Sequence, residues 1–383
     1  MIVKYAMIMT KLLNSNQAEI INAIKLLIYK ENQTLLEKVD FDDDDVFLEP
    51  LLFAYFNSRN ENLFSTAMLK EIMQGYFIKK EEIEINYSFN INGIGYIPKL
   101  GYFIKGEKIP FESNITVRDT NIEILKYPLS LLQNIFRISS TNLINEDEII
   151  IDSDLFEKNI LPLTNAFQFI KESSVEHFKL ITQCCKKCVL FKTNPENINS
   201  FATIYAHGIA FFNVYQDDYD EVFFVDDIAH QTGHIILNTL FHNRKIIFNT
   251  DENQNIGKIL KKKDRRSIYV LLHAFYTYYT TMMCLDTCLE NNLFNEKQKK
   301  EAIARVGFYL EKISRDFQNF EKVNIHFFGI ENVLTESGIQ IYSMIEAKYH
   351  EVFEKWNSVT KHFDYSNQTY NFTFKNFAEI NTK

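Results

Sequence analysis

The first 74 residues carry apolar side chains at the spacing of amphipathic helices. From Tyr5 to about Gln74 the apolar positions recur every three or four residues, and glycine and proline are almost absent. These positions include Ile20, Ile21, Ile24, Leu27, Ile28, Leu35 and Leu36. The pattern predicts three or four helices in this part of the chain.

Between Gly75 and Ile124 the periodicity changes from helical spacing to alternation. The run from Glu82 to Tyr87 alternates acidic or polar residues with apolar ones, as a half-buried strand does. Asn92-Gly93 and Gly101 interrupt the alternation and are typical of turns. We therefore expect a small antiparallel sheet here.

The second half of the chain is predicted to be mostly helical. A helix is expected over 166–187, followed by strand-like runs at 201–205 and 209–212. Further helices are expected over four ranges, which are 228–241, 267–289, 296–320 and 331–361. The last twenty residues are polar enough to predict a loose tail.

These patterns together predict an α+β fold that is predominantly α-helical. Residues 1–150 form a helical N-terminal part with a small antiparallel sheet, and 151–361 form a helical metal-binding catalytic domain. Residues 362–383 are the expected C-terminal tail. The sequence does not predict an oligomeric state.

Composition and charge narrow the classes of function. Apolar residues make up 46% of the 383 positions and charged residues 24%, as in a folded protein, and a net charge of −9 argues against nucleic acid as a partner. The uncharged run 267–285 holds a histidine, three threonines and four tyrosines, which favours a buried helix over a membrane span. With five cysteines and no signal-peptide pattern, we expect a cytoplasmic protein without a disulfide framework.

Two histidines are spaced to bind one metal ion. His230 and His234 lie four residues apart in a predicted helix, so their imidazoles share one face. Asp226 and Asp227 precede them by one turn and are candidate acceptors for the outer ring nitrogens. The spacing alone is as compatible with two structural histidines as with a metal site.

A third histidine strengthens the metal interpretation. His273 lies near the middle of the predicted helix 267–289, with Tyr269 one turn before it and Arg266 two turns before it. We take it as the third ligand. Other residues remain possible ligands by their distance along the chain, and these are His207, His242, Glu252, Asp264 and Asp286.

Gln231 decides between two kinds of metal chemistry. A zinc peptidase places the Glu that activates its bound water directly after the first histidine, and Gln231 cannot accept a proton. A non-haem Fe(II) oxygenase does not need that base. A zinc-dependent hydrolase or lyase with a three-histidine site, and a non-catalytic peptide-binding protein, remain the alternatives.

Residues 166–289 resemble the HExxH-type peptide-modifying proteins of ribosomal peptide natural-product clusters, which are described as 2-oxoglutarate-dependent peptide β-hydroxylases. The likeness rests on the order of four features: a strand with a central glycine (His207 to Phe211), an acidic lead, His230 to His234, and Arg265-Arg266 before His273. Gln231 departs from the Glu of the family name.

The resemblance implies a cofactor, a co-substrate and a substrate. Fe(II) would be held by His230, His234 and His273, and 2-oxoglutarate would serve as co-substrate for hydroxylation of a side chain in a precursor peptide. Residues 1–150 would recognise the leader segment of that peptide. Arg266 is the first choice for the far carboxylate of 2-oxoglutarate, because a guanidinium can bind it in two places, and Arg265 is the second. Gln231 stands at the catalytic position and Tyr269 is expected beside the co-substrate.

Overall fold

The computed structural model describes residues 2–58, 64–80, 90, 92–107, 109–140, 149–369 and 371–381. Across these residues the fold is α+β and predominantly helical, as predicted. The alternating run 82–87 lies outside the described residues. The chain forms two compact units, each built from separate stretches of sequence.

The first compact unit, called the sheet unit, comprises Asn14–Thr164 and Ile181–Asp218. Its five-stranded sheet has the order β3-β4-β5-β7-β6, and the strands are β3 (Ile115–Thr116), β4 (Glu123–Leu125), β5 (Lys187–Phe191), β7 (Ile209–Asn213) and β6 (Phe201–Ala202). The strands β4, β5 and β7 are parallel, with Glu123 opposite Lys187 and Lys187 opposite Ile209. A separate antiparallel hairpin pairs β1 (Ile94–Ile97) with β2 (Gly101–Ile104).

The antiparallel prediction is confirmed at β1–β2 and at β3–β4, but the centre of the larger sheet is parallel. The helix expected over 166–187 is wrong at its end: α7 (Val175–Cys184) stops early and β5 follows. The physical reason is burial. Every residue of β5 and β7 is buried, so these strands read as continuous apolar runs without alternation.

The sheet unit also contains several helices, the first of which, α1, begins in the other unit. The described part of 2–74 contains α1 (Ile2–Leu36), α2 (Asp44–Phe47), α3 (Pro50–Asn57) and α4 (Thr66–Met73), which confirms the predicted number. A further helix, α5 (Ser130–Ser139), packs the ring of Phe136 edge-on against Phe191 and Phe211 of the sheet. These aromatic contacts fix α5 on the sheet.

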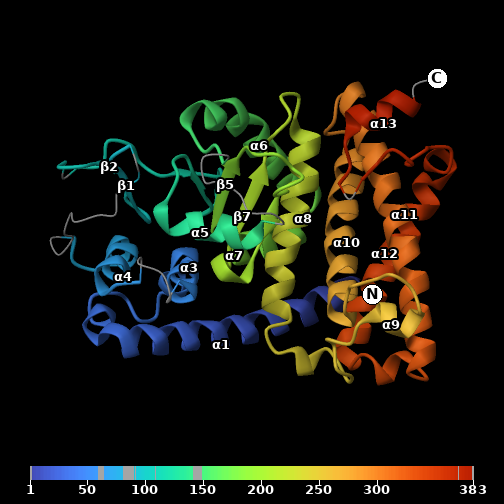
Figure 1. Ribbon diagram of the computed structural model, residues 1–383, viewed down its shortest axis with the longest axis horizontal. Helices are drawn as coiled ribbons and strands as arrows, with labels where there is room; N and C mark the ends of the chain where they lie inside the picture. The colour runs from blue at the N-terminus through green and yellow to red at the C-terminus, as the bar shows by residue number, and fades with distance from the viewer. Residues whose placement is uncertain are drawn as a thin grey trace. The chain divides into compact units, whose positions relative to one another are not determined.

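The second compact unit, called the helical unit, comprises Met1–Leu13, Asn165–Leu180 and Tyr219–Lys383. It contains α8 (Glu221–Leu240), α9 (Ile256–Leu260), α10 (Ile268–Glu290), α11 (Glu296–His326), α12 (Glu336–Thr360) and α13 (Phe374–Asn381), and α6 (Ser153–Ser173) reaches into it. The helix α10 packs against α8, α11 and α12 (Figure 1). Asp220 and Ser267 cap the first turns of α8 and α10 through side-chain acceptors.

The predicted loose tail is wrong. Residues 374–381 form α13, and the side chains of Phe372 and Phe377 are buried. The ring of Phe372 contacts that of Phe308 on α11, and Phe377 contacts Tyr365. Aromatic side chains spaced along a polar segment therefore fix it to the helical unit.

The expected boundary at residue 150 does not coincide with the compact units. The strands before residue 150, β3 and β4, belong to the same sheet as the later strands β5, β6 and β7. The division into a recognition region 1–150 and a catalytic region 151–361 stays a prediction about function. Among the described residues, no helix is long and apolar enough to cross a bilayer.

A buried histidine makes the helical unit sensitive to acid. His177 on α7 is buried, its Nε2 has no hydrogen-bond partner among the described residues, and desolvation lowers its pKa from 6.5 to about 4. The folded state therefore holds the neutral ring, whereas the unfolded chain takes up a proton below pH 6.5.

We expect the free energy of unfolding to fall as the pH drops from about 6.5 towards 4, by at most about 1.4 kcal/mol per pH unit for this one group. Urea titrations at several pH values measure it. The variant His177→Phe should lose this part of the pH dependence. An unchanged dependence in the variant would show that His177 is not a source of acid sensitivity.

Candidate metal centre

The helices α8 and α10 approach each other closely at one glycine. A Cβ built on Gly233 would lie 2.6 Å from Thr280 Oγ1 and 3.5 Å from Thr277 Cα. The Thr280 hydroxyl donates a hydrogen bond to the Ala229 carbonyl of α8, at 2.9 Å. The small residue and this bond between helices set the distance at which side chains of α8 meet side chains of α10.

Replacing Gly233 with Ala should test this contact. Alanine normally stabilises a helix relative to glycine, by about 1 kcal/mol. Here the new methyl group must displace the Thr280 hydroxyl, so we expect a loss of about 1–3 kcal/mol in the free energy of unfolding. Chemical denaturation measures it. In a Gly233→Ala/Thr280→Ala double variant the loss should be smaller than the sum of the single changes, and strict additivity would contradict the predicted clash.

Three histidines meet at this crossing, and we call them the histidine cluster (His230, His234 and His273). The ring centroids of His230 and His234 on α8 are 4.9 Å apart, and those of His234 and His273 on α10 are 4.6 Å apart. His234 Nδ1 lies 2.7 Å from His273 Nε2, so one ring donates a hydrogen bond to the other. All three side chains are partly exposed. The structure thus brings together the three predicted ligands.

The surroundings keep these imidazoles neutral. Desolvation lowers the pKa of His234 to about 4. Desolvation together with the neighbouring rings lowers the pKa values of His230 and His273 well below the usual range, with further contributions from Lys312 and Arg244 respectively. A neutral imidazole has the free lone pair that a metal ion requires.

The donor chemistry of the cluster fits a transition metal, and its geometry fits in part. Two nitrogen ligands at about 2.0–2.1 Å from one ion lie ~3 Å apart, which is a few tenths of an ångström more than the His234–His273 contact. His230 Nδ1 instead lies 3.5 Å from Thr281 Oγ1. Within the described ranges, no three His, Cys, Asp or Glu side chains are arranged to hold a metal ion. Metal binding would therefore require the three rings to rearrange.

The acidic pair before the histidines contacts other partners. Asp226 accepts hydrogen bonds from Arg305 and from the Tyr309 hydroxyl, each at 2.7 Å, and Asp227 accepts one from Gln231 Nε2 at 2.8 Å. The Gln231 Oε1 atom is buried without a hydrogen-bond partner among the described residues. The Gln231 amide therefore acts as a hydrogen-bond donor to Asp227. The catalytic role of Gln231 stays a prediction.

The structure places Arg266 between two carboxylates. Its guanidinium makes a two-pronged bond to Asp316, at 2.7 and 2.8 Å, and a further bond to Asp264 at 3.0 Å. The guanidinium that was expected to bind 2-oxoglutarate already binds the carboxylates of Asp316 and Asp264. The second choice, Arg265, is exposed to solvent.

A cation that the sequence analysis missed lies closer to the cluster. The Arg244 guanidinium stacks on the ring of Tyr269 at 4.0 Å, and that ring contacts His273 with centroids 5.4 Å apart. The Arg244 Nη1 atom donates to Glu252 at 3.2 Å and to Asn253 at 3.5 Å. It follows α8 in a 3₁₀ turn (Arg244–Ile246), and no spacing rule in the sequence links it to His273.

The other candidate ligands are engaged elsewhere. Glu252 pairs with Arg244 and Asp264 with Arg266, while Asp286 accepts from Lys348, Lys355 and Trp356. His207 belongs to the sheet unit and packs against Phe53, and His242 is exposed after the end of α8.

A groove in the helical unit, called the α10–α11 groove, shares one lining residue, Tyr278, with the surroundings of the cluster. It has a volume of about 1090 Å³ and is lined by α10, α11 and residues 362–369. Tyr278 lines it, and its ring lies 6.1 Å from that of His230. The Lys312 amine lies over the Tyr278 ring at 4.7 Å, and burial lowers its pKa to about 8.

No protein-family model matches the chain, and no curated protein is similar to it at a significant level.

Proposed function

We propose that the chain is a cytoplasmic Fe(II)- and 2-oxoglutarate-dependent hydroxylase that acts on a side chain of a ribosomally made precursor peptide. His230, His234 and His273 are its metal ligands. The observation that carries the proposal is the meeting of three neutral imidazoles from two helices, of which the i, i+4 spacing places His230 and His234 on one face and the packing of α8 on α10 adds His273.

The neighbours of the cluster favour oxidation over hydrolysis. The Gln231 amide donates to Asp227 and has no carboxylate with which to take a proton from water. A bound Fe(II) ion would supply the activation of dioxygen, which needs no such base. The roles of the chain are then to hold the ion through three imidazoles and to orient the co-substrate and the peptide.

We assign the binding of the far carboxylate of 2-oxoglutarate to Arg244 in place of Arg266. Asp316 and Asp264 occupy the Arg266 guanidinium, and a ligand would have to displace both. The Arg244 guanidinium stacks on Tyr269 and donates through Nη1. Other N–H groups of this guanidinium are available to an incoming carboxylate. Tyr269 keeps its predicted place beside the co-substrate.

The α10–α11 groove is the proposed substrate site. A peptide needs an extended cleft, and the volume of this groove is at the upper end of ordinary ligand pockets. Tyr278 and Lys312 would bring a bound side chain next to His230. The exposed part of the groove carries charges of both signs, among them Arg315 and Glu311, which suits a peptide with mixed charge.

Succinate formation with Fe(II), 2-oxoglutarate and precursor peptides from the surrounding gene cluster tests the proposal. Arg244→Met should raise the KM for 2-oxoglutarate by about tenfold or more, because a charged hydrogen bond is lost. The exposed Arg265→Met variant is the control and should behave as the wild type. Tight zinc binding with peptide hydrolysis and no succinate would instead favour the zinc enzyme.

A further inference from the structure

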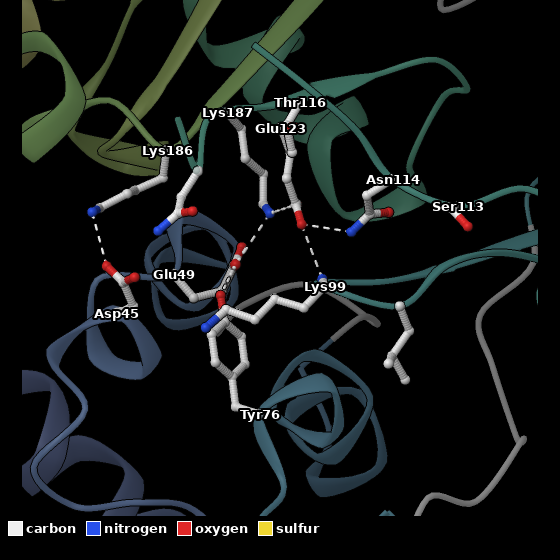
Figure 2. Close-up of a pocket in the computed structure, with 12 residues that line it drawn as sticks. Asp45, Glu49, Tyr76, Lys99, Ser113, Asn114, Thr116, Glu123, Lys186 and Lys187 are labelled. Carbon is white, nitrogen blue, oxygen red and sulfur yellow. Dashed lines mark hydrogen bonds and ion pairs between the residues drawn. The ribbon is translucent and has the colours of Figure 1, made fainter. Parts of the chain in front are cut away.

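A polar pocket lies in the sheet unit and is separate from the histidine cluster. Its volume is about 480 Å³, and its wall comes from α2, the residue that caps α3, the 3₁₀ turn after α4, the β1–β2 turn, the segment from Ser113 to Glu123, and the start of β5 (Figure 2). All of its lining residues belong to the sheet unit. Nothing in the proposed hydroxylation uses them.

The floor of this pocket carries more negative than positive charge. Lys187 is 2% exposed and contacts Glu49 at 3.1 Å and, more closely, Glu123 (Figure 2). Burial opposes charge on Glu123, but the Lys187 ammonium lowers the pKa of this carboxyl, so it is ionised. Two carboxylates thus share one ammonium. The remaining hydrogen bonds to them come from neutral donors, such as the Tyr76 hydroxyl, which donates to Glu49 at 2.6 Å.

One acceptor beside this floor has no donor. Asn114 uses its amide nitrogen to donate to Glu123, as Figure 2 shows. The Asn114 Oδ1 atom is buried and has no hydrogen-bond partner among the described residues. A buried acceptor without a donor is unfavourable, and a ligand with N–H groups relieves it once the Asn114 side chain turns Oδ1, which solvent does not reach here, into the pocket. The deep end of the pocket therefore suits a positively charged donor.

The mouth of the pocket presents a cation. The side chain of Lys99 is 42% exposed, and its amine lies 3.8 Å from Asp43, which is beyond hydrogen-bond distance, and 4.4 Å over the Tyr76 ring. Lys186, in contrast, is paired with Asp45 at 2.9 Å. The Lys99 amine is therefore the group at the mouth best placed to receive an anion.

We propose that this pocket binds a free α-amino acid. The ammonium group of the ligand donates to Asn114 Oδ1 and faces the excess charge of Glu49 and Glu123, while its carboxylate pairs with Lys99. The volume is within the range of small-molecule sites. Because most of the lining is polar, the preferred amino acid has a small or polar side chain.

Calorimetric titration of the full chain with L-alanine, L-serine, L-threonine, L-glutamine and L-aspartate tests the proposal. Each ligand is compared with its N-acetyl form, which lacks the ammonium, and with its amide, which lacks the carboxylate. At least one free amino acid should bind, and each modified form should bind about tenfold more weakly or worse.

Protein variants then locate the site. Lys99→Gln should weaken binding of the free amino acid about tenfold or more but leave binding of its amide unchanged, because only the carboxylate pairs with Lys99. Asn114→Leu should weaken both forms. The exposed Lys105→Gln variant, changed just after β2 and outside the pocket lining, is the control and should bind as the wild type does.

Three outcomes would overturn the proposal: no binding of any of these amino acids at millimolar concentration, equal binding of the acetylated forms, or inorganic phosphate competing for the pocket. The last two would indicate a simple anion site. Since Lys99 lies at the surface, its variant is expected to fold even if Asn114→Leu does not. Metal content of the protein is independent of every outcome.

Discussion

Replacing His234 with alanine is expected to abolish tight metal binding and to reduce hydroxylation to background. His234 is the middle member of the histidine cluster, with ring contacts to both His230 and His273. Its removal leaves two separated imidazoles, and we expect the affinity for Fe(II) to fall by about 100-fold or more. Anaerobic titration with a competing chelator measures this affinity.

His242→Ala is the matched control for this prediction. His242 follows α8 by two residues, is exposed, and is the same type of residue on the same segment. Its replacement should leave both metal affinity and activity unchanged. Equal affinities in the His234→Ala and wild-type proteins would remove the cluster as the metal site.

Arg305→Met is expected to lower the free energy of unfolding by about 3–5 kcal/mol. The Arg305 guanidinium is buried on α11, where it bonds Asp226 at 2.7 Å and Glu301 at 2.7 and 2.9 Å. Removing it leaves two buried carboxylates without a countercharge. Since Asp226 lies one turn before His230, the change should also loosen the α8 segment that carries the cluster.

Arg315→Met on the same helix is the control. The side chain of Arg315 is 64% exposed, and its Nη2 atom lies 3.6 Å from Glu311 Oε1, which is longer than a hydrogen bond. Exposed pairs of this kind contribute about 0–1 kcal/mol, so this variant should unfold almost as the wild type does in urea. A loss in Arg305→Met no larger than in the control would contradict the role given to the buried network.

The helical unit and the cluster followed closely from sequence periodicity. The helices α8 and α10 carry apolar residues at helical spacing over most of their length and have side-chain caps. The four-residue spacing places His230 and His234 on one face of α8 whatever the tertiary structure is. That His273 faces them depends on how α8 packs on α10. The sequence predicted His273 as the third ligand from its place in a long helix, but no spacing rule could place it opposite the other two.

The errors came from long-range pairing. The run Lys187–Phe191 follows a helix directly, and only its pairing with β4 and β7 makes it a strand. The pairing of Arg266 with Asp316 could not be inferred either, because the two residues lie 50 positions apart, and the co-substrate role given to Arg266 stays a prediction. The position of Arg244 beside Tyr269 depends on tertiary packing in the same way.

The pocket of the sheet unit shows the same limit more strongly. Glu49, Glu123 and Lys187 come from three distant segments, and each is an ordinary charged residue in the sequence. They form a charged cluster only in the folded protein, where the pairing of β4 with β5 places Glu123 opposite Lys187. A sequence pattern marks no such site.

The metal content of protein purified without oxygen, measured with and without added 2-oxoglutarate, shows whether the histidine cluster is an iron site. We expect about one iron per chain after reconstitution with Fe(II), a weak visible charge-transfer band when 2-oxoglutarate is added, and loss of both in His234→Ala. Protein that takes up no more iron than the His234→Ala variant, and shows no such band, would contradict this expectation.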